Sequence, residues 1–186
     1  RLGIERSHRT PLEDLPHLSQ ADRHQRRHVE AAIDHYYRGE TTATEAYDTY
    51  VTEKVRRILN RLIGVKICEV RDLLVGTLDT QPEYGGRSYL QYTVGEIAGE
   101  LTTGAADGLE PVLELAFQEL EAELGSIFSR SRSRSIDIDP AVIRSVTNEL
   151  HALEDEIWQS DETIGWVYQY FGEEERSELD NRINDS

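Results

Sequence analysis

The chain has 186 residues and a formal net charge of −16, and it contains 2 Lys against 18 Arg. A length of this order suffices for one domain with a buried core. The single cysteine, Cys68, excludes an internal disulfide and a zinc site made from several cysteines. No apolar run reaches the roughly 18 to 20 residues of a membrane span, so we expect a cytoplasmic protein without a membrane partner.

The first part of the chain, residues 1–76, predicts two helices. Apolar residues recur on one helix face between positions 21 and 38, and Gly39 is expected to end that helix. A second and much longer helix follows, and Gly76 is its expected stop. Its apolar positions are Tyr47, Tyr50, Val51, Val55, Ile58, Leu59, Leu62, Ile63, Val70, Leu73 and Leu74.

The central part, residues 77–128, predicts a loop and two helices. Pro82, Gly85 and Gly86 indicate a loop over 77–88. The spacing of apolar residues over 89–101 favours a short helix. Another helix is expected to open near Pro111 and to carry an apolar stripe as far as Phe128.

A run of alternating Ser and Arg, within residues 129–138, is typical of an exposed linker. Asp139 and Pro140 then predict the start of a helix that continues through Ile157, and Asp161 is the expected cap of a further helix. Residues 139–186 therefore complete a single helical region. The predicted fold class is all-α, an irregular bundle of about six helices.

Two charged residues lie on the apolar arc of the long helix. Lys66 and Glu69 are three residues apart, so their side chains can reach each other. We interpret them as a buried pair that specifies which helix packs there. A catalytic role for Glu69 is the alternative, but no second acid or histidine is visibly positioned with it, and no catalytic residue is predicted.

Basic side chains form a stripe on another edge of the same helix, and the Ser/Arg run adds three more arginines. A solvated helix face is the ordinary interpretation of such a stripe. Contact with DNA phosphates is the functional one. The candidate DNA contacts are Arg56, Arg57, Arg61, Arg130, Arg132 and Arg134.

Metal and cofactor motifs are not found in the sequence. His24, His28 and His35 fall on one side of a helix, yet they have arginine neighbours and no His-Glu-x-x-His pattern, so no metal site is predicted. The sequence also lacks a Gly-rich nucleotide loop and an Asn-Pro-Pro-Tyr element, which would bind a flipped base. We therefore assign no cofactor-binding residue.

Two strings carry a family resemblance. Residues 57–74 read Arg-Ile-Leu-Asn-Arg-Leu-Ile-Gly-Val-Lys-Ile-Cys-Glu-Val-Arg-Asp-Leu-Leu, and residues 164–171 read Ile-Gly-Trp-Val-Tyr-Gln-Tyr-Phe. With Ser-Tyr-Leu-Gln-Tyr at 88–92 between them, they resemble the helices that precede the catalytic core of BREX-type (PglX-like, Eco57I-like) adenine-specific DNA methyltransferases. The motif positions are Asn60, Arg61, Glu69, Gly165, Trp166, Tyr168, Gln169 and Tyr170.

The resemblance implies the N-terminal helical region of a longer enzyme that transfers a methyl group from S-adenosylmethionine to adenine N6 in phage defence. S-adenosylmethionine would be the cofactor of the parent protein, and this segment alone would be inactive. The expected partners are DNA, through the full-length protein, and other defence proteins. This region would brace the catalytic domain.

The acidic composition leaves a second function open. The residues through Arg71 carry a net charge of +2 (13 basic, 11 acidic), and the remainder carries −18 (7 basic, 25 acidic). Such an excess resembles halophilic proteins, in which molar salt shortens the Debye length to about 3 Å and so does not exclude DNA binding. The alternative is a free-standing acidic helical interaction protein, either a DNA mimic or a regulatory subunit.

Overall fold

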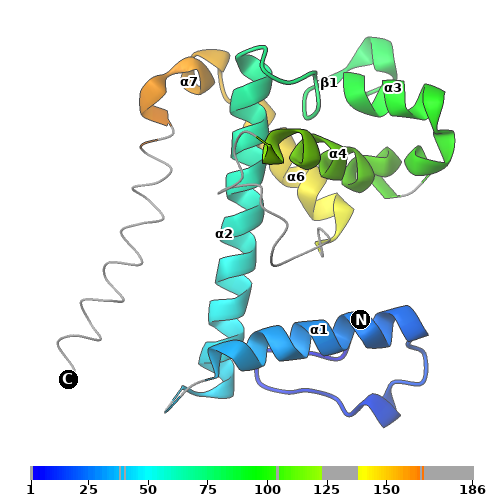
Figure 1. Ribbon diagram of the computed structural model, residues 1–186, viewed down its shortest axis with the longest axis vertical. Helices are drawn as coiled ribbons and strands as arrows, with labels where there is room; N and C mark the ends of the chain where they lie inside the picture. The colour runs from blue at the N-terminus through cyan, green and yellow to red at the C-terminus, as the bar shows by residue number, and fades with distance from the viewer. Residues whose placement is uncertain are drawn as a thin grey trace. The chain divides into compact units, whose positions relative to one another are not determined.

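The all-α prediction is confirmed in a computed structural model that describes residues 2–37, 39, 41–103, 105–122, 138–163 and 165 (Figure 1). The described residues also contain two short strands, β1 (Thr80–Gln81) and β2 (Arg87–Ser88), which pair in antiparallel orientation. The chain divides into two units, Arg1–Arg56 and Arg57–Ser186, and the boundary falls inside helix α2 (Ala43–Val70).

In the first unit, α1 (Gln20–Tyr36) matches the predicted N-terminal helix. A capping box starts it, because Ser19 accepts a hydrogen bond from the Asp22 backbone and the Asp22 side chain accepts one in return. The guanidinium group of Arg26 is buried and donates to the carbonyl oxygens of Leu2 (2.9 Å) and Thr10 (2.6 Å). This arginine therefore fastens the N-terminal segment to α1.

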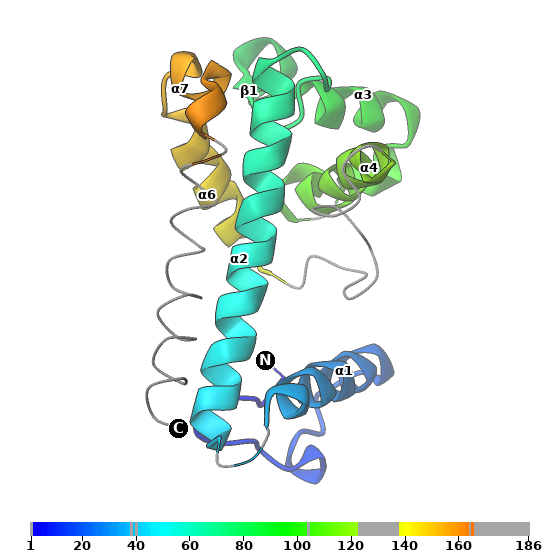
Figure 2. The same cartoon turned by 60° about the vertical axis from the view of Figure 1, so that its left-hand side comes forward.

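The second unit is built on the C-terminal half of α2. Helices α4 (Leu109–Glu121) and α6 (Pro140–His151) lie beside it in both Figure 1 and Figure 2. Their buried apolar side chains, with Trp158 of α7 (Asp155–Gln159), form one core. Cys68 belongs to this core, and burial raises the pKa of its thiol.

The end of α2 was predicted wrongly. The helix stops at Val70 and not near Gly76, because Asp72 adopts a left-handed conformation with φ 56°. The N–H groups of Asp72 and Leu73 then bond back to the carbonyl oxygens of Glu69 (3.1 Å) and Cys68 (2.8 Å). This is a Schellman termination, in which asparagine and aspartate can replace the usual glycine.

Three smaller boundaries also differ from the sequence expectation. The expected loop 77–88 contains the β1–β2 hairpin, and the expected helix from Pro140 to Ile157 is broken into α6 and α7. The break allows Trp158 to join the same core as Leu150. Ser160, and not Asp161, caps the next helical turn, since its Oγ accepts from the N–H of Glu162 (3.3 Å).

A strained turn precedes α4. Ala106, Asp107 and Gly108 all have positive φ angles (52°, 55° and 70°), and two of them are not glycine. Gln91, on α3 (Tyr89–Ile97), donates to the carbonyl oxygens of Ala106 and Asp107 (both 3.1 Å), and Arg144 donates to that of Ala106 (3.0 Å). These side chains from α3 and α6 offset the cost of the left-handed backbone.

We expect Gly108→Ala to destabilise the protein by at least about 2 kcal/mol. A Cβ at this position would lie 2.3 Å from the carbonyl oxygen of Leu101, on a backbone with φ 70°. Gly99→Ala is the matched control, because a Cβ there meets nothing within 4 Å. Equal urea midpoints for the two variants would contradict the strain argument.

Candidate functional site

A polar centre lies where α2 ends, and we call it the α2 hub: two of its side chains are buried, Asp79 is half-buried and His151 is exposed. It consists of Lys66, Glu69, Asp79 and His151. Lys66 is 1% exposed and Glu69 is 9% exposed. Burying two ionised side chains is costly unless both find partners, so their contacts decide what the site can do.

The Glu69 carboxylate accepts three backbone hydrogen bonds. They come from the N–H groups of Thr77 (2.8 Å), Leu78 (3.2 Å) and Asp79 (3.2 Å). The Schellman termination turns the chain back, and so brings these N–H groups over the last helical turn. Glu69 thereby holds the loop after α2.

Burial is the main cause that raises the pKa of Glu69 above its usual value of 4.5, and the charge of Asp79 raises it further. The three N–H donors act in the opposite direction because they stabilise the carboxylate. The net shift is upward.

Lys66 pairs with Asp79 and not with Glu69, which corrects the predicted pair. Its Nζ donates to Asp79 Oδ1 at 2.6 Å, and Nδ1 of His151 lies 2.7 Å from the same oxygen. The sequence argument considered only neighbours on one helix, whereas the loop supplies better partners for both charges. Asp79 therefore links α2 to α6.

The hub has the chemistry of a structural brace. Its carboxylates are engaged by N–H groups, an ammonium and an imidazole, and the hydroxyl of Thr77 donates to the carbonyl oxygen of Val75 (2.7 Å). In the described part of the chain, no group of three or more His, Cys, Asp or Glu could hold a metal ion. His24 and His28 contact each other at 3.0 Å, and His35 packs against Tyr36.

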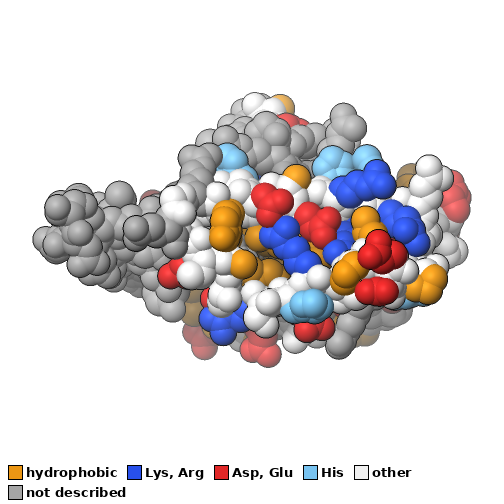
Figure 3. Space-filling view, turned by 90° about the horizontal axis from the view of Figure 1, so that it is seen from below, with side chains coloured by type: hydrophobic (Ala, Val, Ile, Leu, Met, Phe, Trp, Pro, Cys, Tyr) orange, Lys and Arg blue, Asp and Glu red, His pale blue; other side chains and the backbone are white. Residues whose placement is uncertain are grey.

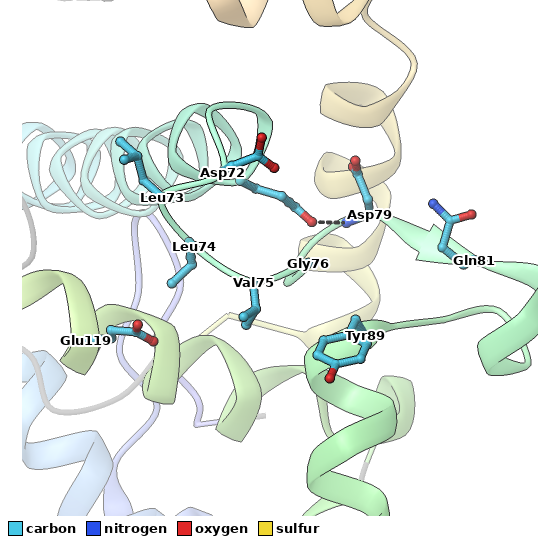
Figure 4. A pocket seen from close by; sticks show the side chains of 10 residues that line it. Asp72, Leu73, Leu74, Val75, Gly76, Asp79, Gln81, Tyr89 and Glu119 are labelled. Carbon is cyan, nitrogen blue, oxygen red and sulfur yellow. Dashed lines mark hydrogen bonds between the residues drawn. The ribbon is translucent and has the colours of Figure 1, made fainter.

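A pocket of about 620 Å³ lies beside the hub. The turn after α2 lines one side, and Tyr89 and Glu119 line another (Figure 4). Glu69 and Asp79 reach its wall, but both already have partners.

The candidate arginines of α2 differ in their burial and in their contacts. Arg61 is 7% exposed and its guanidinium lies 5.3 Å from the ring centre of Phe117, so it is a core residue and not a surface phosphate contact. Burial lowers its pKa. Arg56 pairs with Glu53 at 3.3 Å, and Arg57 is half-buried. Figure 3 shows the molecule from below the view of Figure 1, and on that face basic and acidic side chains are interspersed.

The motif positions of the resemblance fall into two groups. Asn60, Arg61 and Glu69 lie on α2, the last two of them buried, and Gly165 is exposed. The remaining positions lie outside the described residues, as do the Ser/Arg arginines; they are Trp166, Tyr168, Gln169, Tyr170, Arg130, Arg132 and Arg134.

Sequence reasoning missed Asp79 and His151. Asp79 lies in a segment without periodicity, and His151 lies 72 positions further along the chain. One signal could have pointed to Asp79: a lysine on the apolar arc of α2 needs an acidic partner.

Comparison with known proteins identifies no relative. No protein-family model, curated protein or solved structure matches the chain. Among the described helices, none combines the length and apolar character that crossing a bilayer requires.

Glu69→Ala should reduce the free energy of unfolding by about 3 kcal/mol, because three N–H groups lose their acceptor and two of these hydrogen bonds are buried. Glu149→Ala is the control: this side chain is exposed on α6, and its removal should change stability by less than about 0.5 kcal/mol. Urea denaturation measures both. Similar losses for the two variants would show that Glu69 is not the acceptor that holds the loop.

The raised pKa of Glu69 predicts a pH dependence. A carboxyl whose pKa is higher in the folded than in the unfolded state loses its contribution as pH rises through the folded pKa. The stability of the wild type relative to Glu69→Gln should therefore fall as pH increases from about 4.5. Urea denaturation of both proteins from pH 4 to 8 tests this, and a difference that grows with pH would mean that the N–H donors outweigh burial.

Proposed function

We propose that this chain is the helical region preceding the catalytic domain of an S-adenosylmethionine-dependent adenine-N6 DNA methyltransferase of a BREX-type phage-defence system. One observation carries the proposal. The string of residues 57–74, which resembles that family, is also the segment around which the second unit is built, and its motif residues Arg61 and Glu69 are buried. Buried residues of this kind support a structural role for the segment, because they pack inside the unit.

The role of this region would be to brace the enzyme. Glu69 fixes the loop after α2, and Asp79 connects that loop to α6, so hydrogen bonds join the loop to two helices of the second unit. Methyl transfer to adenine N6 would take place in the catalytic domain of the parent protein, which would bind S-adenosylmethionine and mark host DNA. The protein would act in the cytoplasm with DNA and other defence proteins as partners.

Activity of the full-length protein tests the proposal. Incubated with S-adenosylmethionine and DNA, it should produce N6-methyladenine, detected by mass spectrometry of the released nucleosides. The isolated 186-residue chain should neither bind the cofactor in calorimetry nor methylate DNA, because no cofactor loop or Asn-Pro-Pro-Tyr element is present in it. A full-length protein without methylation would leave the acidic interaction protein as the better assignment.

DNA contact by this region is a separate prediction. If Arg56 and Arg57, or the three Ser/Arg arginines, contact phosphates, then their replacement by Glu should flatten the plot of log affinity against log salt by about 0.9 per lost contact. Sequence preference should not change, because phosphate contacts carry no base information. Filter binding of the full-length variants over a salt series measures this.

Arg27→Glu, an exposed position on α1, controls for the change in overall charge. Arg61 is excluded from the test because it is buried, so its replacement could weaken DNA binding by unfolding the protein and not by removing a phosphate contact. Slopes equal to that of the control would restrict this region to scaffolding.

A further inference from the structure

The pocket beside the α2 hub has an exposed apolar rim. Leu73, Val75 and Tyr89 are 68%, 46% and 46% exposed, and all three line it. Figure 4 shows Leu74 and Val75 pointing toward the side on which Glu119 and Tyr89 lie. Large apolar side chains gathered around a concave surface are typical of interaction sites.

The backbone holds one of these side chains in solvent. In a Schellman termination, the residue after the left-handed position often packs against the last helical turn. Here Asp72 is the left-handed residue, with φ 56°, yet the following Leu73 is exposed. The N–H of Leu73 bonds to the carbonyl oxygen of Cys68 at 2.8 Å, so this exposure belongs to a hydrogen-bonded turn.

The charge of the pocket is negative. Among its lining residues, Glu69 and Asp79 are engaged within the hub, whereas the carboxylates of Asp72 and Glu119 are exposed and have no hydrogen-bond or ion-pair partner among the described residues. None of the lining residues is basic. A cationic group flanked by apolar groups would complement both properties of this surface.

We propose that this pocket docks a polypeptide segment of another protein through an arginine flanked by apolar residues. The guanidinium would be attracted to the pocket by the exposed carboxylates of Asp72 and Glu119, which lie among its lining residues. The flanking apolar side chains would cover Leu73 and Val75. Arginine and aromatic side chains are enriched in such interfaces. This docking site does not depend on the proposed methyltransferase function.

The test uses the whole 186-residue chain and the probe peptide acetyl-Ser-Leu-Arg-Leu-Ser-amide, with amide NMR spectra recorded during titration. The signals of Leu73, Val75 and Gly76 should shift and saturate. A peptide with citrulline in place of arginine should bind about tenfold more weakly, because citrulline keeps the shape and removes the charge. Affinity should also fall as salt increases.

Two isosteric variants locate the contact. Asp72→Asn and Glu119→Gln should each weaken peptide binding about fivefold, and Asn is tolerated at the positive φ of position 72. Glu149→Gln, on α6, should leave affinity unchanged. Circular-dichroism melting of each variant verifies that the fold is retained.

Three outcomes would overturn the proposal. The first is the absence of a saturable shift at the pocket signals, and the second is equal binding of the arginine and citrulline peptides. The third is a change of the same signals with protein concentration alone, accompanied by a dimer in sedimentation, which would assign the surface to a second copy of this chain.

Discussion

The second unit depends on the hydrogen bonds of one side chain. The Glu69 carboxylate, at the end of α2, accepts three of them from backbone N–H groups. It fixes the loop 77–79, and so places Asp79 between Lys66 of α2 and His151 of α6. The carbonyl oxygen of Gly76, just before this loop, accepts the N–H of Leu90 in the first turn of α3. The Glu69 side chain thereby helps to fix the positions of α2, α3 and α6 relative to one another.

The energetic role of this network is specificity more than stability. Removing ions from water is costly, and apolar residues of similar volume often stabilise a core as well or better. The driving force of folding comes from the apolar core shared by α2, α4, α6 and Trp158. An apolar side chain at position 69 would, however, leave the N–H groups of the loop without an acceptor. The charged hub therefore selects one loop conformation among those that the core would allow.

The same constraint shapes the surface beside the hub. The loop that Glu69 holds is continuous with the turn that exposes Leu73 and Val75, so the interior polar network and the pocket rim are formed by one short stretch of chain. A scaffold for a catalytic domain and a docking site for another protein both need a surface of fixed shape. The described geometry is consistent with either use, since it fixes the backbone and leaves the rim side chains accessible.

The elements whose signals are local could be predicted from the amino-acid sequence. The capping residues Asp139 and Pro140, the periodicity of α1 and α4, and the burial of Lys66 and Glu69 on one arc of α2 all follow from spacing along the chain. The exclusion of a disulfide followed from composition alone. These properties depend on a few residues of the same element, so no knowledge of the tertiary fold was needed.

The pairing of the charges, and the burial or exposure of each arginine on α2, depended on packing between elements. Lys66 and Glu69 could have paired across one helical turn, but a loop more than seven residues beyond Glu69 supplied acceptable partners for both. Arg61 shared a stripe with Arg57 in the sequence, yet α4 brings Phe117 over it and places it in the core. The physical reason is the same in both cases: the partner comes from another element, and its position is set by packing and not by helical period.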